Sequence, residues 1–186
     1  MFRRKANKIK SRLGTLGDNS GYLTCSMFVA HKKMPSYSIV PYPTFENAIN
    51  ALKCGEVSLV LVPSAYSLIN RFIMDKKICV MKTFIEIIPP LVIVGKNFKR
   101  EGILKDVTKI YLHEATISIL NELKFESAPS ICKVESNIEA CKFLLDDEDI
   151  NSCAITNLLC AKYFDLNIIK TLRDGVKMPW VIFSKK

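Results

Sequence analysis

The sequence has no C-x-x-C pair among its seven cysteines, and only two of its 186 residues are histidine. Structural zinc sites and redox-active dithiols usually depend on paired cysteines, so neither is expected and no metal is predicted. The cysteines lie singly among apolar residues, and their number is odd. This pattern is typical of reduced thiols in a protein core and favours a cytoplasmic protein.

Long hydrophobic runs are also absent. No segment approaches the roughly 20 apolar residues that a membrane helix needs, and none follows the positive N-terminus as it would in a secretory signal. We therefore expect no membrane partner. Hydrophobic residues nevertheless make up 49% of the chain, so it can bury a core as one domain or as two small lobes.

Acidic residues are few relative to basic ones, 18 against 27, which gives a formal net charge of +9. The basic residues cluster only near the N-terminus, where residues 1–9 are expected to form a basic, disordered leader. No helix-turn-helix, RNA-recognition or zinc-finger pattern accompanies them. No nucleic-acid partner is therefore predicted, and we interpret the charge as a general attraction for small anions.

Local patterns predict strands that alternate with helices. A β-rich run at 37–42 is followed by Thr44, an N-cap residue, and by apolar residues at helical spacing up to Gly55, a typical helix stop. The continuous apolar run at 57–63 then suits a strand that is buried on both faces. These three elements form a predicted βαβ unit.

The rest of the chain repeats the alternation. Residues 77–96 are β-rich, and a bend is expected at Pro89-Pro90 because proline cannot lie within a central strand. Ser136 and Glu139 have capping-box spacing before another helix. Further strands are predicted at 109–113, 131–136, 152–157, 167–172 and 180–185. The predicted fold class is α/β, with mixed, mostly parallel sheets and helices on both faces.

Small or polar residues stand at four predicted strand ends: Gly14 to Ser20, Ser64 to Tyr66, His113 to Thr116, and Thr156 with Asn157. Ligands of α/β sheets bind beyond such ends, where helix N-termini offer amides to an anion. Each segment also has a structural interpretation, with the glycines as a turn, Thr156 as a cap, and His113 and Tyr66 as packed side chains. The residues alone leave both interpretations open.

The order of these segments resembles that of the prephenate dehydratase catalytic domain. The similar stretches are LGTLGDNSGY, TFENAINALKCGEVSLVLVP, YLHEA and CAITNLLCAKYFDLNII, and the resemblance spans nearly all of residues 10–186. It implies a two-lobed fold of the periplasmic-binding-protein-like type II class, with a cleft between the lobes. Lobe 1 is expected at about 10–78 plus 160–186 and lobe 2 at about 79–159, in a single domain, 1–186, without a regulatory ACT domain.

The C-terminal strand departs from the dehydratase pattern. Met178-Pro179-Trp180 stands where the dehydratases have Thr-Arg-Phe, and methionine has no proton to give to a leaving ring hydroxyl. The stretches VPSAYSLINRFIM, AITNLLCAKYFDL and MPWVIF resemble instead the non-aromatizing prephenate decarboxylases of bacilysin and tetrahydrotyrosine pathways. Such an enzyme removes CO₂, retains the hydroxyl and protonates a ring carbon, giving a dihydro-4-hydroxyphenylpyruvate.

This second resemblance implies a carboxy-lyase of antibiotic biosynthesis with a small dianionic substrate, prephenate, with no cofactor, and with a homodimer as a further expectation. It implies catalytic roles for His113 and Tyr66. The implied substrate-binding residues are Gly14, Thr15, Gly17, Asn19, Ser20, Ser64, Thr116, Thr156, Asn157, Lys177 and Trp180. Two alternatives stay open: a divergent dehydratase that gives phenylpyruvate, and a non-catalytic module that binds a small anion in the same fold.

Overall fold

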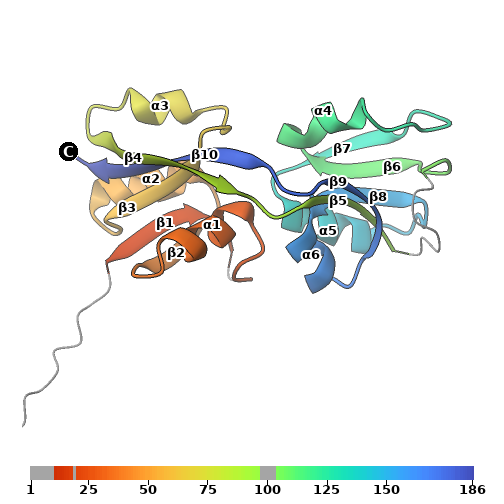
Figure 1. Ribbon diagram of the computed structural model, residues 1–186, viewed down its shortest axis with the longest axis horizontal. Helices are drawn as coiled ribbons and strands as arrows, with labels where there is room; N and C mark the ends of the chain where they lie inside the picture. The colour runs from red at the N-terminus through yellow and green to blue at the C-terminus, as the bar shows by residue number, and fades with distance from the viewer. Residues whose placement is uncertain (1–10, 19, 97–103) are drawn as a thin grey trace, which may run out of the picture.

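The computed structural model describes residues 11–18, 20–96 and 104–186, which form two α/β lobes side by side (Figure 1). The expected leader, residues 1–9, lies outside the described residues. The first lobe has a five-stranded sheet in the order β2-β1-β3-β10-β4, and the second has a five-stranded sheet in the order β7-β6-β8-β5-β9. The predicted α/β fold class is confirmed.

Each strand predicted from the sequence has a counterpart here. The first lobe contains β1 (Arg12–Leu16), α1 (Cys25–Lys33), β2 (Ser38–Tyr42), α2 (Phe45–Cys54), β3 (Leu59–Pro63), α3 (Ile69–Ile73), β4 (Ile78–Ile87) and β10 (Lys177–Lys185). The second contains β5 (Leu91–Gly95), β6 (Lys109–His113), the 3₁₀ turn η1 (Glu114–Thr116), α4 (Ile117–Leu120), β7 (Ser130–Val134), α5 (Asn137–Asp146), β8 (Ser152–Asn157), α6 (Leu158–Tyr163) and β9 (Asn167–Arg173). None of the helices in these described ranges is both long enough and apolar enough to cross a membrane.

Helix α2 shows why the local predictions succeed. Thr44 Oγ1 accepts a hydrogen bond from the amide of Asn47 at 3.1 Å, which caps the helix N-terminus. Gly55 ends the helix in the left-handed conformation, with φ 80°, which glycine adopts without steric cost. The apolar face, including Ile49 and Leu52, is buried against the first sheet. Both ends and the buried face of α2 are therefore set by residues within the segment itself.

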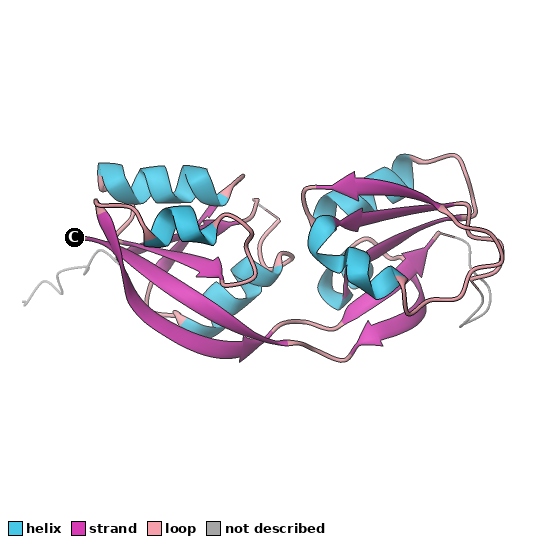
Figure 2. Cartoon of the chain, turned by 90° about the horizontal axis from the view of Figure 1, so that it is seen from above, coloured by secondary structure: helices cyan, strands magenta, loops and turns pink. Residues whose placement is uncertain are grey.

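The chain crosses between the lobes twice. The first crossing contains Pro89 and Pro90, between β4 and β5, and the second contains Gly175, between β9 and β10. The two crossing segments run together along one side of the molecule (Figure 2), and the amide of Ile88 donates to the carbonyl of Val176 at 3.0 Å. The predicted bend at the proline pair is thus one of the two connections between lobes.

The expected lobe boundaries were wrong at both crossings. Strand β4 belongs to the first lobe because it pairs along its length with β10, so residues 79–87 do not lie in lobe 2. Helix α6 and strand β9 belong to the second lobe because β9 pairs with β5. Strand pairing over long sequence separations sets these boundaries, and neither segment carries a local signal of it.

The sheets are more evenly mixed than expected. The parallel pairs are β1 with β2 and β3, and β6 with β7 and β8. The pairs made by β10 and β5 are antiparallel. These two strands are the ones that follow a crossing, so their direction reverses relative to the neighbouring βαβ strands. The carboxyl ends of β1, β3, β6 and β8 remain aligned toward the region between the lobes.

Each lobe has apolar clusters on both faces of its sheet. In the first lobe one cluster packs under α2 and α3, around Phe72 and Phe183, and the other packs under α1, around Leu13 and Trp180. The second lobe has corresponding clusters under α5 and α6 and on the side of α4. All seven cysteines are free; the buried ones are Cys141, Cys153 and Cys160, whereas Cys54 is exposed, so the prediction of core thiols was wrong for Cys54.

Candidate functional site between the lobes

A cavity of about 490 Å³ lies between the lobes and is lined by residues from both. Its wall combines the N-terminal ends of α1, α2 and α5, the turn η1, the segment after β3, and the crossing segments. A second cavity of about 480 Å³ adjoins it and shares Leu16, Pro43, Glu135 and Ser136. The carboxyl ends of parallel strands therefore open into one space, as expected for an α/β ligand site.

Three capped helix N-termini face the main cavity. Thr24 Oγ1 accepts from the amide of Met27 at 3.0 Å in α1, and Thr44 and Ser136 cap α2 and α5 in the same way. Each cap satisfies one of the first amides and leaves others at the open end of the helix. Cys25 and Ser26, the first two residues of α1, line the cavity. Their amides, together with the positive end of the helix dipole, suit a carboxylate.

The three N-termini differ in their electrostatics. The first turn of α1 contains no acidic residue, whereas α2 has Glu46 and α5 has Glu139 there. A carboxylate in the first turn offsets the positive end of its helix. The N-terminus of α1 is therefore the one with an uncompensated positive end. Cys25 itself is not a nucleophile at neutral pH, because burial raises the pKa of its thiol to about 12.

Tyr66, one of the two residues to which the resemblance gives a catalytic role, lies in this cavity. Its hydroxyl donates to Glu46 Oε1 at 2.5 Å, and its ring packs on Phe45 and Phe72, with centroid distances of 4.8 and 5.8 Å. Burial, followed by the hydrogen bond and charge of Glu46 and the charge of Glu135, raises the pKa of Tyr66. Tyr66 is therefore a neutral phenol at physiological pH.

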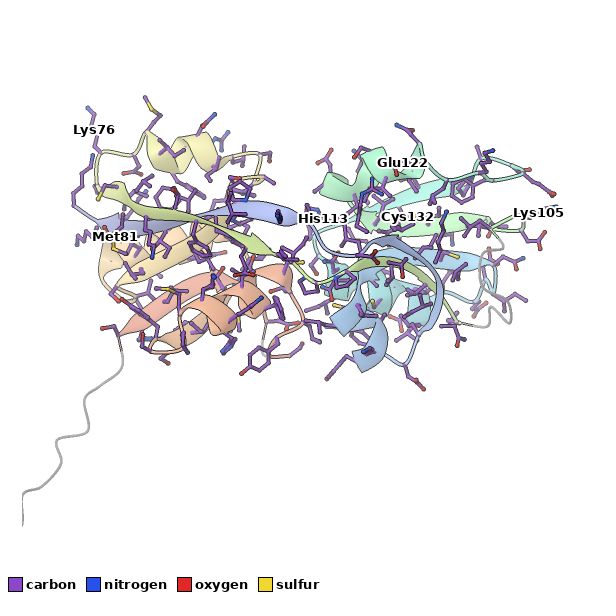
Figure 3. The ribbon with its side chains drawn as sticks, viewed as in Figure 1. Lys76, Met81, Lys105, His113, Glu122 and Cys132 are labelled. Carbon is purple, nitrogen blue, oxygen red and sulfur yellow. The ribbon has the colours of Figure 1, made fainter. Side chains whose placement is uncertain are left out.

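His113 lies in the second lobe on the side that faces the first lobe (Figure 3) and also lines the cavity. Its Nδ1 accepts a hydrogen bond from the amide of Ala115 at 3.2 Å and so caps the turn η1. Thr116, the next predicted residue, lines the cavity and donates from Oγ1 to the carbonyl of His113 at 2.7 Å. The structure thus brings together His113, Tyr66 and Thr116.

Two residues of the crossing region complete the cavity wall. Met178 of β10 lines it, so the position that carries threonine in the dehydratase pattern faces the same space as Tyr66 and His113. Arg173 of β9 also lines it and forms an ion pair with Glu122. This part of the wall therefore offers an apolar thioether and a guanidinium whose charge is already paired with Glu122.

The glycine-rich segment does not form the predicted ligand loop. Gly14 and Thr15 lie inside β1, where a Cβ on Gly14 would approach Tyr42 Cε2 to 2.9 Å, and the buried hydroxyl of Thr15 donates to the carbonyl of Leu61 at 2.8 Å. Gly17 lines only the adjoining cavity. Since α1 begins at Cys25, several residues beyond these glycines, the helix amides that face the ligand space come from Cys25 and Ser26.

Among the described residues that follow these glycines, Ser20 adds nothing to the main cavity. The amide of Ser20 donates to Asp18 Oδ1 at 2.8 Å in a local turn, and Ser20 lies outside both cavity linings. Asn19 lies outside the described residues. Ser64 is exposed, and its amide donates to the carbonyl of Pro179 at 2.9 Å, while its neighbour Ala65 lines the cavity.

Thr156 and Asn157 have structural partners. Thr156 Oγ1 donates to the carbonyl of Asn137 at 3.0 Å. Asn157 Oδ1 accepts from the amides of Leu159 and Cys160 and so caps α6, while its Nδ2 donates to the carbonyl of Leu23 at 2.7 Å. Both side chains are fully buried and lie outside the cavity lining. The prediction that Thr156 and Asn157 contact a substrate is therefore wrong in this structure, because their side chains are buried and already bonded to backbone groups of the protein.

Trp180 and Lys177 also lie outside the lining. Trp180 is fully buried in the first lobe, in the cluster under α1, and its Nε1 has no hydrogen-bond partner among the described residues. It points into the lobe because it shares a face of β10 with Ile182 and pairs with Phe84 of β4. Lys177 is exposed at the start of β10. Trp180, implied by the resemblance as a substrate-binding residue, is therefore a core residue in this structure.

Sequence reasoning missed Glu46 and Glu135, which line the cavity from opposite lobes. Glu46 is in the first turn of α2, where acidic residues are common for helix stability alone. Glu135 directly follows β7, and the β6–β7 register, which pairs His113 with Val134, sets it beside the end of β6. The position of Glu135 thus depends on the β6–β7 register, which the sequence alone does not show. Among the described residues no group of three or more His, Cys, Asp and Glu side chains is placed to hold a metal ion.

Comparisons with known proteins identify the fold. No family model matches the sequence, and no curated protein matches it. Among solved structures, similar ones are the quorum-quenching acylase GqqA (TM-score 0.64, 17% identity, 94% of this chain and 64% of that chain) and the prephenate dehydratase of Arthrobacter aurescens in complex with L-Phe (0.66, 15%, 94% and 60%). The methionine-binding protein MetQ is also similar (0.60, 14%, 95% and 83%).

These likenesses establish a two-lobed fold of the periplasmic-binding-protein-like type II class, as the sequence predicted. The chain spans 64% of GqqA and 60% of the dehydratase. The similar structures include an enzyme, the dehydratase, and a ligand-binding protein, MetQ. The fold is therefore compatible with both functions, and the function has to be argued from the cavity.

Proposed function

We propose that this protein is a cofactor-independent prephenate decarboxylase that retains the ring hydroxyl of its substrate. The observation that carries the proposal is the shared cavity of Tyr66, His113 and Met178. Tyr66 and His113, the two candidate proton donors, line the same cavity as Met178. In the dehydratase pattern, the position of Met178 carries a threonine. The dehydratase among the structural neighbours adds support for a substrate of this class.

The proposed reaction balances with one proton. The bond between the ring and its carboxylate breaks, CO₂ leaves, and the bonding electron pair moves through a ring double bond to a carbon that takes up a proton. The hydroxyl stays, so the product is non-aromatic. The ring diene carries the electrons, and no cofactor is proposed.

The cavity offers a place for each part of the substrate. The amides of Cys25 and Ser26, at the uncompensated N-terminus of α1, would hold the carboxylate of the pyruvyl side chain. Tyr66, whose raised pKa keeps it protonated, and His113, which lines the same cavity, are the two candidate proton donors to the ring carbon. Thr116 holds the backbone of His113 and so positions it.

Met178 explains the retained hydroxyl. Loss of the hydroxyl needs a proton on its oxygen, and the methionine thioether cannot supply one. Aromatization would otherwise compete with protonation of the ring carbon. In this proposal the reaction outcome therefore depends on the absence of an acid at one position as much as on the presence of acids at two others.

Incubation of the purified protein with prephenate at neutral pH tests the proposal. We expect a product that has lost CO₂, keeps its hydroxyl by mass and lacks aromatic ultraviolet absorption. Phenylpyruvate above the spontaneous background would indicate a dehydratase instead. No turnover above background would contradict both, and would favour a binding protein for a small organic acid.

A further inference from the structure

The cavity wall contains two chemically different groups of residues. The N-terminus of α1 presents Cys25 and Ser26 without an acidic residue in its first turn. Glu46 and Glu135 line the same cavity: Glu46 accepts from the Tyr66 hydroxyl at 2.5 Å, and the charge of Glu135 contributes to the raised pKa of Tyr66. The first group attracts an anion, and the second repels one.

The two glutamates come from different lobes. Glu46 is in the first turn of α2, and Glu135 follows β7 directly before the N-cap of α5. The carboxylate of Glu46 has one oxygen taken by Tyr66 and a second oxygen that can accept another bond. The backbone amide of Glu135 donates to Glu139, but the side chain of Glu135 has no hydrogen-bond partner among the described residues. Both carboxylates can therefore accept a hydrogen bond from a ligand.

We infer that Glu46 and Glu135 form the hydroxyl-binding part of the cavity wall and select a keto acid whose ring carries a hydroxyl opposite its carboxylate-bearing side chain. The inference rests on the proposed function, which supplies the substrate class. The negative charge of the two glutamates disfavours a ligand carboxylate beside them, whereas a ligand hydroxyl can donate to them.

This assignment has a chemical consequence for the reaction. A hydroxyl that donates its proton to a carboxylate carries more negative charge on its oxygen, so it is a poorer leaving group than a free hydroxyl. Departure would also require a new proton on that oxygen, and the two glutamates are acceptors when ionised. Glu46 and Glu135 thus act in the same direction as Met178 and favour retention of the hydroxyl.

The test compares two stable ligands that differ only in the ring hydroxyl, 4-hydroxyphenylpyruvate and phenylpyruvate, by titration calorimetry. We expect the wild-type protein to bind the hydroxylated acid about ten-fold more tightly, since a hydrogen bond to a charged group supports a preference of that size. Glu135→Ala should reduce the preference to about two-fold or less with phenylpyruvate affinity unchanged, and Glu46→Ala should do likewise. Glu56→Ala is the matched control: Glu56 accepts from Tyr42 at 2.8 Å, in the first lobe but outside the cavity, and its loss should leave the preference intact.

Three results would overturn the inference. One is a wild-type protein without preference for the hydroxylated acid, and another is a preference that survives in both glutamate variants. The third is tighter binding of phenylalanine than of phenylpyruvate that Glu135→Ala abolishes, which would assign the glutamates to an ammonium group. Folding of Glu135→Ala is checked by its unchanged phenylpyruvate affinity, and its exposed side chain makes the substitution mild.

Prephenate turnover separates this inference from the proposed function. Turnover by the wild type without any glutamate-dependent hydroxyl preference would support the decarboxylase and overturn the inference. A glutamate-dependent preference for the hydroxylated acid without prephenate turnover would support the inference and contradict the decarboxylase. Where both hold, Glu135→Ala should also release several-fold more phenylpyruvate, relative to the non-aromatic product, than the wild type.

Discussion

The side-chain amide of Asn157, in the second lobe, donates a hydrogen bond of 2.7 Å to the carbonyl of Leu23, which lies in the first-lobe segment before α1. Leu23 itself is almost fully buried in the second-lobe cluster under α5 and α6, and Cys160 Sγ contacts the same carbonyl at 3.3 Å. The segment that leads into α1, whose first residues line the cavity, is therefore fixed on the opposite lobe. The lobes are held together here as well as by the two crossing segments.

Asn157→Ala should lower the free energy of unfolding by about 2 kcal/mol, because it removes the cap of α6 and a buried hydrogen bond between the lobes, each worth about 1 kcal/mol. Urea denaturation at neutral pH measures this loss. Asn50→Ala, at an exposed position of α2, is the control and should change stability little. An equally small effect of Asn157→Ala would show that the contact between the lobes contributes nothing to stability.

Asn157 also shows where sequence reasoning reaches its limit. A polar pair at the end of a buried strand predicts a ligand site as readily as a structural cap, and the deciding partner, Leu23, is more than a hundred residues away. Helix α2 could be predicted with both of its ends because Thr44 and Gly55 act within the segment. The lobe boundary at β4 could not, since it depends on pairing with β10 near the other end of the chain.

The cavity residues divide in the same way. Tyr66, His113 and Thr116 were predicted because they lie at or just beyond the carboxyl ends of β3 and β6, and the common orientation of parallel strands brings such residues together. Glu46 and Glu135 meet only through the arrangement of two lobes. Tryptophan is a residue type that often stacks on ligands. The register of β10 in the sheet nevertheless turns Trp180 into the buried cluster under α1.

Glu86 gives a prediction for pH dependence. Its hydrogen bonds with Lys33 at 2.7 Å and Lys32 at 2.9 Å, and with the amide of Ile87, lower its pKa from 4.5 to about 2. Because the folded-state pKa lies below the unfolded one, this stabilisation is complete above pH 4.5 and is lost as the pH falls toward 2.

Glu86→Gln should therefore reduce the free energy of unfolding at pH 7 by about 1–2 kcal/mol, a range that allows for solvent screening of the half-exposed lysines. The difference from wild type should shrink as urea denaturation is repeated at successively lower pH, down to pH 2. Glu56→Gln removes the exposed pair with Arg12, 3.8 Å apart, and should cost about 0.5 kcal/mol or less. A difference for Glu86→Gln that does not vary with pH would contradict the assigned charge interactions.

Trp180→Phe distinguishes a core role from a ligand role. The phenyl ring keeps most of the buried volume and removes an indole N–H that lacks a partner, so the two effects oppose each other and stability should change by about 1 kcal/mol or less. Affinity for 4-hydroxyphenylpyruvate, measured by calorimetry, should stay within two-fold of wild type. A ten-fold loss of affinity with stability unchanged would place the indole at the ligand.

Tyr66→Phe tests the proposed proton donor. The substitution leaves the ring on Phe45 and Phe72 but removes the hydroxyl that Glu46 holds. If Tyr66 protonates the ring carbon, kcat for prephenate should fall by about 100-fold with a smaller change in KM, since general acid catalysis contributes about that factor. An unchanged kcat would leave His113 as the donor, and His113→Gln should then show the loss.

Met178→Thr tests the proposed retention of the hydroxyl at the residue that faces the cavity from β10. Threonine introduces a hydroxyl that can donate to the departing oxygen, so part of the prephenate consumed should become phenylpyruvate, measured by its aromatic absorption against the spontaneous background. Met178→Leu is the matched control, because it is apolar, of similar volume and without a proton to give. Phenylpyruvate from both variants would point to looser packing of the cavity, whereas its formation by Met178→Thr alone would show that one missing acid decides between the two reactions.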